Sequence, residues 1–300
     1  MVDFIHNNKD RYGVDAICRI LPIAASTYYR TLDLADNPEH RAKRDLHDEH
    51  HAEQIKRIWK ESSGRYGVRK VWQQLKREGY VIARCTVARL MQKLGIQGVW
   101  RGKNKQTTRS RDDQKRAPDL VKRNFRADQP NHLWVADFTY IQTNSGWVYT
   151  AFIIDVFSRA IVGWKVSTRM NTDMVLDALE QALHDRGMPK IVIHHSDRGV
   201  QYLSIRYTNR LEAANLRASV GTTGDSYDNA LAETVNGLYK TEVIEYLKAD
   251  WQGLADVQLA TLNWVDWFNK KRVHSALGYV SPFEFEAMYY DKINPLGQVA

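Results

Sequence analysis

The sequence predicts an α/β domain, with a mixed sheet and helices on both faces, behind an all-α and strongly basic N-terminal half. Hydrophobic residues make up 43% of the 300 residues, which is enough to bury more than one core. Helical periodicity dominates the first half, and β-rich runs begin abruptly after residue 130. The net charge also changes there, from +12 over residues 1–130 to −4 over residues 131–300. The basic half therefore predicts a polyanionic partner.

Two short helices around a turn are expected in residues 1–38. Apolar residues recur at helical spacing at Val14, Ile17 and Leu21, a proline can start the turn, and a second helical pattern follows. This segment is typical of a helix-turn-helix-like region. Residues 39–60 alternate charges around a few apolar side chains, which indicates a connecting helix.

A second helix-turn-helix pattern occupies residues 61–100. Residues 60–105 carry 12 basic side chains against two acidic ones, the density expected of a module that neutralises phosphates. A solvated helical face would usually mix signs, so this charge favours a basic DNA-binding domain. The residues of its second helix expected to contact a major groove are Arg84, Thr86, Arg89 and Lys93.

Hydrophobic residues nearly vanish in residues 101–130, where basic residues are frequent. The composition predicts an extended cationic linker. It could follow a DNA backbone, with contacts from Arg101, Lys103 and Lys105, or it could simply keep two domains apart.

The second half predicts a core domain over residues 131–250 and a C-terminal helical extension over residues 251–300. Three β-rich runs with short separations, at Leu133–Ile141, Trp147–Phe157 and Ala160–Val166, suit an antiparallel meander. The elements expected next are a helix (172–186), a strand (191–195), a helix (207–215), a strand (217–220) and a helix (231–246). This order favours a mixed sheet covered by helices.

Two aspartates occupy chemically unusual places on these strands. Asp137 lies in the middle of an otherwise apolar strand, where a buried carboxylate is costly unless a cation accompanies it. Asp197 follows the strand that ends at His195, and ligands bind at the carboxyl ends of strands in open α/β sheets.

A third acid and a lysine follow on the last helix of the core. Glu233 points away from the apolar stripe expected from Leu231, Val235 and Leu238. Lys240 is two turns further along and lies on the same face as Glu233. We therefore expect both side chains to face an open site.

Basic residues also follow an aromatic stripe in the C-terminal extension. They could reach DNA, and a solvated loop is an equal alternative. These residues are Lys270, Lys271, Arg272 and His274.

The spacing of the acids resembles the catalytic core of DDE transposases and retroviral integrases. There are 59 residues between Asp137 and Asp197, and 35 between Asp197 and Glu233, with a basic residue seven positions later. More narrowly, the chain is similar to the second-frame transposases of the IS-three family of bacterial insertion sequences, from the first helix-turn-helix to about Tyr290. The segments that carry this resemblance are Trp134–Tyr140, His195–Tyr202, Ser226–Ala230 and His274–Tyr279.

The resemblance implies a ribonuclease-H-like core that holds two Mg²⁺ ions, or Mn²⁺, on Asp137, Asp197 and Glu233. Hard divalent cations prefer oxygen ligands, and two such ions can activate the attacking oxygen and stabilise the leaving one. The implied function is a DNA transposase that binds terminal inverted repeats and then cleaves and joins DNA. The alternatives are a nuclease of the same fold that does not join strands, and a DNA-binding repressor of transposition.

The expected partner is double-stranded DNA, both element ends and target. The resemblance also implies a homo-oligomer on DNA and a fusion with, or binding to, the product of an upstream frame. The longest apolar run, Val148–Ile154, is too short to cross a bilayer, and no signal-peptide core is evident. The expectation is a bacterial cytoplasmic protein that associates with the nucleoid.

Overall fold

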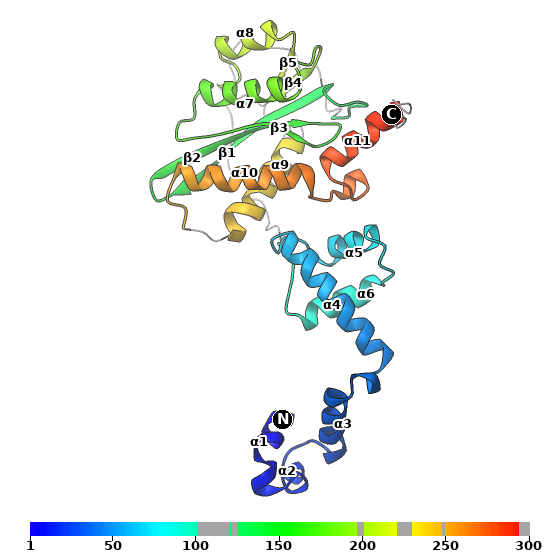
Figure 1. Ribbon diagram of the computed structural model, residues 1–300. Coiled ribbons are helices and arrows are strands. Elements are labelled where there is room, and N and C mark those ends of the chain that lie inside the picture. The colour runs from blue at the N-terminus through cyan, green and yellow to red at the C-terminus, as the bar shows by residue number, and fades with distance from the viewer. Residues whose placement is uncertain (101–120, 122–124, 197–200, 221–229, 248–249, 294–300) are drawn as a thin grey trace.

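A computed structural model describes residues 1–100, 121, 125–196, 201–220, 230–247 and 250–293 (Figure 1). The described helices before residue 100 form two successive groups, which lie below the α/β domain in the figure. Their bounds are α1 (Val2–Tyr12), α2 (Val14–Ile20), α3 (Ala25–Asp36), α4 (Lys43–Glu61), α5 (Val68–Arg77) and α6 (Arg84–Lys93), with a short 3₁₀ turn at Pro38–His40.

The first group, α1 to α3, has a small core of its own. Ile5, Ile17 and Tyr28, one from each helix, are buried together. The sequence pattern predicted α2 and α3 but missed α1, because that helix has few apolar residues to reveal its period.

The second group combines the basic helix pair α5 and α6 with α4. Buried residues of all three helices share one cluster, which includes Ile55, Ile58, Val71, Leu75, Val87 and Leu90. The predicted connecting helix, α4, thus also packs against α5 and α6.

The α/β domain contains a five-stranded mixed sheet in the order β3-β2-β1-β4-β5. The strands are β1 (Leu133–Thr143), β2 (Gly146–Asp155), β3 (Ile161–Ser167), β4 (Ile193–Ser196) and β5 (Arg217–Val220). The first three pair antiparallel, as the meander predicted, and β4 and β5 run parallel to β1.

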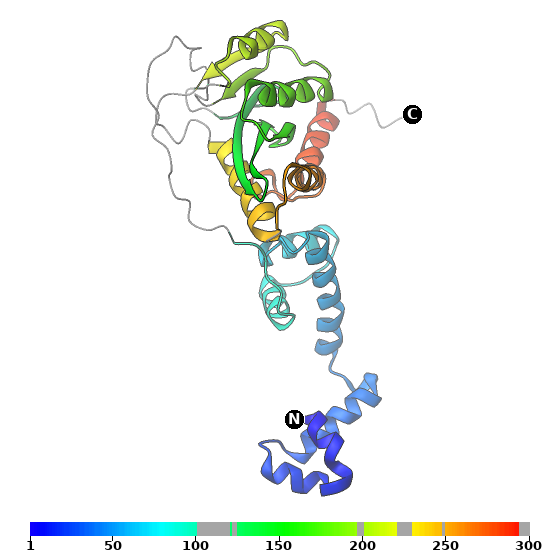
Figure 2. The same ribbon diagram turned by 90° about the vertical axis from the view of Figure 1, so that its left-hand side faces the viewer.

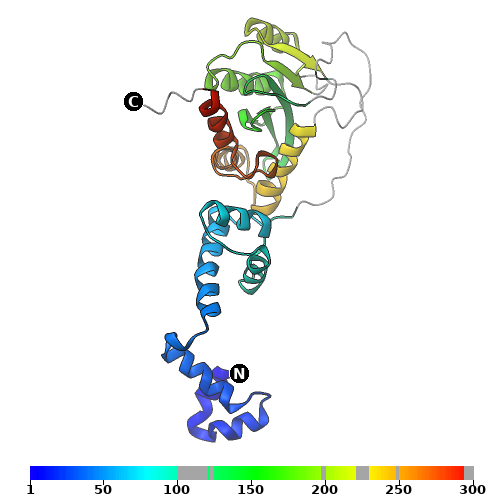
Figure 3. The same cartoon turned by 90° about the vertical axis from the view of Figure 1, so that its right-hand side faces the viewer.

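Helices cover both faces of the sheet, because its strands alternate apolar side chains toward two separate cores. Trp134 and Ala136 of β1 pack with α7 (Thr172–Asp185) and α8 (Ile205–Ala213). Leu133 and Val135 pack instead with α9 (Ala230–Tyr239) and α10 (Leu254–Lys270). Figure 3 shows the sheet between these layers. The predicted ribonuclease-H-like fold class is confirmed.

Gly163 on β3 permits the close approach of α7. A Cβ atom there would lie 2.2 Å from the carbonyl oxygen of Ala178, far inside van der Waals contact. This glycine therefore sets the distance between the sheet and one of its covering helices.

The basic helical group packs against the α/β domain at the loop that joins α4 to α5. The Tyr66 hydroxyl accepts a hydrogen bond from the Val273 N–H (2.8 Å) and donates one to the Lys271 carbonyl (3.2 Å). Figure 2 shows the helical group of α4 to α6 directly below the α/β domain. The remaining elements are a π-helical turn (Lys240–Glu245), a 3₁₀ turn (Ser275–Leu277) and α11 (Pro282–Ile293). None of the described helices is both long enough and apolar enough to span a membrane.

Candidate active site

Asp137 lies on β1 immediately after the pairing with β4 ends. The parallel register runs from Leu133 opposite Ile193 to Ala136 opposite Ser196. The carboxylate is half-buried, and its two oxygens accept hydrogen bonds from the Phe138 N–H and from the side-chain amide of Asn236, both at 2.8 Å. Asp137 is therefore oriented by its own strand and by α9.

Asp197 lies outside the described residues, but the register determines where its strand ends. Ser196 is the last residue of β4 and pairs with Ala136, so Asp137 and Asp197 each follow one member of that pair. The carboxyl end of β4 therefore lies beside the strand position that precedes Asp137, at the end of the sheet where ligands bind in open α/β folds.

Glu233 projects from the first turn of α9 and is exposed. It lies three residues before Asn236, so the two share one side of the helix. Because Asn236 bonds directly to Asp137, α9 carries Glu233 toward the strand that bears Asp137.

Asn236 is a site residue that sequence reasoning missed. It is buried, and its Oδ1 atom has no hydrogen-bond partner among the described residues. The available signal was its spacing from Glu233, since an amide one turn from a candidate ligand can orient the neighbouring carboxylate.

The apolar stripe predicted for α9 is wrong in part. The buried apolar residues are Ala232, Val235 and Tyr239, whereas Leu231 and Leu238 are only half-buried. The helix is rotated so that Asn236 faces β1, where it finds a polar partner.

Lys240 begins the π-helical turn that continues α9. Its ammonium lies 4.7 Å from the centre of the Tyr140 ring. Burial lowers the pKa of Lys240, and the negative charges of Glu245 and Asp137 act in the opposite direction. The lysine is therefore near enough to Asp137 to interact with its charge.

The residues predicted to bind DNA on α6 have different environments. Arg84 and Lys93 are exposed and Thr86 is half-buried. The Arg89 guanidinium holds both carboxylate oxygens of Asp48 on α4, at 2.7 and 2.8 Å. This ion pair joins α6 to α4, so Arg89 must release Asp48 before its guanidinium can contact a DNA base. Arg101, Lys103 and Lys105 lie outside the described residues.

Neither alternative predicted for the basic segment after α10 holds for Arg272 and His274, which are both buried. Arg272 pairs with the buried carboxylate of Glu242 at 2.6 Å. The indole of Trp264 also donates to Glu242, at 3.1 Å. These side chains hold the end of α10 against the π-helical turn, so they are structural.

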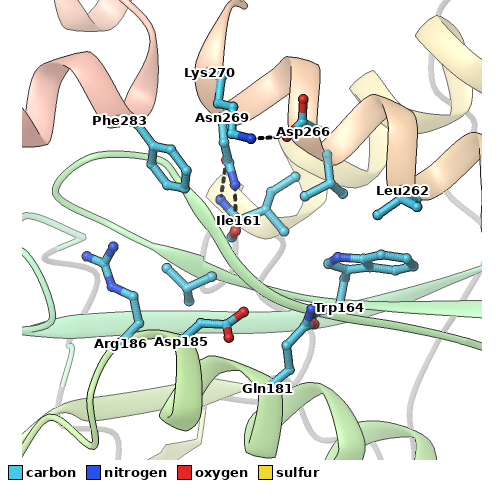
Figure 4. A pocket seen from close by; sticks show the side chains of 12 residues that line it. Ile161, Trp164, Gln181, Asp185, Arg186, Leu262, Asp266, Asn269, Lys270 and Phe283 are labelled. Atoms are coloured by element: carbon cyan, nitrogen blue, oxygen red, sulfur yellow. Dashed lines mark hydrogen bonds and ion pairs between the residues drawn. The ribbon is translucent and has the colours of Figure 1, made fainter.

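One cavity in the described part of the chain lies elsewhere, beside the edge strand β3 (Figure 4). It has a volume of about 230 Å³ and lies between α7, α10 and the start of α11. The Asn269 side chain bonds both the N–H (2.9 Å) and the carbonyl (2.8 Å) of Ile161, which covers that edge. Since β2 separates β3 from β1, this cavity is distinct from the acid site.

Family models match most of the chain. Two models described as integrase core domain match residues 127–226 and 214–282, and a helix-turn-helix-like domain matches residues 46–104. The last match includes most of α4, in agreement with the core that α4 shares with α5 and α6.

The chain is similar to transposases along nearly its whole length. It is 51% identical to the transposase for insertion sequence element IS629 of Shigella sonnei, over 98% of each chain. It is 50% identical to a putative transposase for IS986/IS6110 of Mycobacterium tuberculosis, over 90% of this chain and 97% of that one. Identity to the Escherichia coli transposase InsF for IS3A is 31%, over 94% and 97%. Among solved structures, the HTLV-2 integrase catalytic core domain in complex with magnesium is 20% identical, with a TM-score of 0.43, over 54% of this chain and 99% of that one.

Full-length similarity at this level, together with the integrase core and helix-turn-helix-like matches, defines the family. The chain belongs to the IS-three family of insertion-sequence transposases, DNA-cleaving and DNA-joining enzymes of the DDE superfamily.

Proposed function

We propose that this transposase cleaves and joins DNA at a two-metal site formed by Asp137, Asp197 and Glu233. The observation that carries the proposal is the convergence of their elements. Asp137 directly follows the residue of β1 that pairs with Ser196, the last residue of β4, and the Asn236–Asp137 bond holds the helix of Glu233 beside β1. Mg²⁺ is the proposed ion, and Mn²⁺ should substitute for it.

The donor set suits hard divalent cations, which take carboxylate, carbonyl and water oxygens as ligands. Asp137 and Glu233 offer carboxylates from two different elements, and the Oδ1 atom of Asn236 is a buried oxygen without a hydrogen-bond partner in the described part of the chain. When bound, the two ions would lower the pKa of the attacking hydroxyl or water and stabilise the leaving 3′ oxygen. The hydrogen bond from the Asn236 amide fixes the orientation of the Asp137 carboxylate.

The basic helical half is proposed to bind the terminal inverted repeats, with Arg84 and Lys93 as exposed contacts. We further propose assembly as a homo-oligomer on the DNA, fusion with or binding to an upstream-frame product, and action on the nucleoid in the bacterial cytoplasm. Of the rival functions, a repressor would bind repeats without any metal-dependent reaction. A nuclease would nick DNA without forming a joined product.

Removal of divalent metal should abolish both cleavage and joining but leave repeat binding nearly unchanged. The acids act through the metals, whereas phosphate contacts by basic side chains do not need them. The measurement is strand transfer of a labelled element end in Mg²⁺, in Mn²⁺ and in EDTA, with binding measured in parallel. Nicking without a joined product would support the nuclease, and joining in EDTA would refute the metal site.

Lys240→Ala should reduce strand transfer about tenfold or more, with little change in the free energy of unfolding. A lysine beside Asp137 can hold a phosphate next to the scissile bond, so its loss removes positioning rather than proton transfer. Lys240→Arg should restore part of the activity. Crosslinking from position 240 should fall within a few nucleotides of the element end, and a crosslink confined to distant repeat sequence would return Lys240 to the role of an ordinary surface lysine.

A further inference from the structure

Two aromatic side chains remain exposed on the hairpin formed by β1 and β2. Tyr140 is 48% exposed and Trp147 is 49% exposed, whereas Trp134 and Phe152 of the same strands are fully buried. The two exposed rings lie 5.3 Å apart in an edge-on arrangement. Burying such large rings would stabilise the protein, so a paired exposed surface suggests an interaction site.

The strand register places both rings on one face. Tyr140 pairs with Tyr149, and Gln142 pairs with Trp147, so Tyr140 and Trp147 are diagonal neighbours. Tyr140 lies three residues beyond Asp137 on β1, about 10 Å along the strand and on the opposite face of it. Lys240, from the helix that continues α9, nevertheless reaches the Tyr140 ring at 4.7 Å. The rings therefore lie within a few nucleotides of the proposed reaction centre.

The hairpin that carries the rings is held rigidly at its tip. The Asn144 and Ser145 N–H groups donate to the carbonyls of Trp251 and Gln252, at 2.8 and 3.1 Å. The Asn144 side chain donates to Asp250 at 2.8 Å. The position of the exposed rings is thus fixed before any ligand arrives, which lowers the entropic cost of binding.

A positive charge lies beside this surface. The Lys240 ammonium is 4.7 Å from the centre of the Tyr140 ring and interacts with the charge of Asp137. Aromatic faces beside a cation are the combination that binds single-stranded nucleic acid, since the rings stack on bases and the cation meets the backbone.

We propose that Tyr140 and Trp147 form a stacking surface for one unpaired nucleobase of the DNA strand that reacts at Asp137. The proposal rests on the proposed function, because it assumes that this strand lies along Lys240. A base in an intact duplex is covered on both faces, so the stacked base must leave its pair. Stacking on an aromatic side chain is worth about 1–3 kcal/mol per base, which corresponds to about a tenfold to hundredfold effect.

The test combines protein variants with DNA that lacks single bases. Trp147→Ala and Tyr140→Ala should each reduce strand transfer about tenfold on intact element ends, whereas Trp147→Phe and Tyr140→Phe should retain most of it. The matched control is Tyr290→Ala on α11, which removes an aromatic ring of equal exposure (47%) away from the site.

An abasic site is then introduced in turn at each nucleotide near the scissile bond. At one position the wild-type rate should fall to that of Trp147→Ala on intact DNA, and the variant should lose nothing further. The proposal would be overturned if Trp147→Ala reduced the strand-transfer rate, relative to wild type, by the same factor on intact DNA and on every abasic substrate. It would also be overturned if Trp147→Ala did not reduce the rate at all. A changed oligomeric mass without this position dependence would assign the rings to a protein contact instead.

A binding measurement separates this proposal from the metal site. With 2-aminopurine at the identified position and no metal present, the full chain should quench its fluorescence, and Trp147→Ala should remove the quenching. If the acid assignment is wrong, this quenching persists. If wild type transfers strands in Mg²⁺ and Trp147→Ala transfers them equally well, the stacking surface is wrong and the metal site stands.

Discussion

Asp137→Asn, Asp197→Asn and Glu233→Gln should each reduce strand cleavage and strand transfer about a thousandfold or more. Each substitution keeps the shape of the side chain and removes the charge that holds the metals. Metal-ion stabilisation of the transition state is worth several kcal/mol, and each 1.36 kcal/mol is about tenfold in rate. Single-turnover strand transfer in Mg²⁺ measures the loss.

The same variants should bind terminal repeats with wild-type affinity and unfold at wild-type denaturant concentrations. The matched control is Glu212→Gln, which neutralises an exposed glutamate on α8 and should leave the rate unchanged. Near-normal strand transfer by any one of the three acid variants would remove that residue from the site.

Asn236→Asp and Asn236→Leu extend this reasoning to the side chain that the sequence did not reveal. Both remove the amide donor that orients Asp137, and the aspartate also adds a negative charge beside it. Comparing the strand-transfer rates of these variants with that of Asp137→Asn separates the effect of orienting the Asp137 carboxylate from the effect of its charge.

The sheet was predictable because its strands are rich in β-branched and aromatic residues and are separated by short segments. The strand predicted over Leu133–Ile141 is observed to Thr143, and the short separation predicted before Trp147 contains the observed reversal at Asn144 and Ser145. The helix predicted over 172–186 is observed over Thr172–Asp185. Local periodicity carries this information, so no distant contact was needed.

The contacts around the site could not be predicted in the same way. Asn236 meets Asp137 across 99 positions of sequence, and Glu242 meets Arg272 across 30. A periodic pattern indicates which face of an element is polar, but not which polar residue of another element it will meet. Arg272 therefore gave the same local signal as a solvated or DNA-binding arginine, although it is buried.

The buried Glu242–Arg272 pair leads to the prediction with the largest expected effect on stability. Glu242→Ala should lower the free energy of unfolding by about 3–5 kcal/mol, because it leaves Arg272 buried without its counter-charge. The measurement is chemical unfolding at neutral pH. Replacing both partners, as in Glu242→Leu with Arg272→Met, should recover much of the loss, since a well-packed apolar pair avoids the cost of burying charges.

The pH dependence of stability should identify the carboxylate directly. Burial raises the pKa of Glu242, but the charge and hydrogen bonds of Arg272, with help from Lys70 and Trp264, lower it below its ordinary value of 4.5. The unfolded chain therefore takes up this proton first as the pH falls. The contribution of Glu242 is complete well above pH 4.5 and is lost as the pH falls through the lower pKa of the folded state. Glu242→Gln should lack this component.

Glu242 is a negative charge among cations, so removing it should lower the free energy of unfolding more than removing a neighbouring cation. Lys70 lies near Glu242 and Arg272, and burial, reinforced by Arg272 and opposed by Glu242, lowers the pKa of Lys70 to about 7. Removing this positive charge relieves repulsion, so Lys70→Met should cost much less stability than Glu242→Ala near pH 6, where the lysine is otherwise charged in an unfavourable place. The Arg65 guanidinium donates to the main-chain carbonyl of Glu242 at 3.0 Å, a contact between the basic helical group and the π-helical turn that Glu242→Ala should retain. Equal destabilisation by Lys70→Met and Glu242→Ala would contradict this account of the cluster.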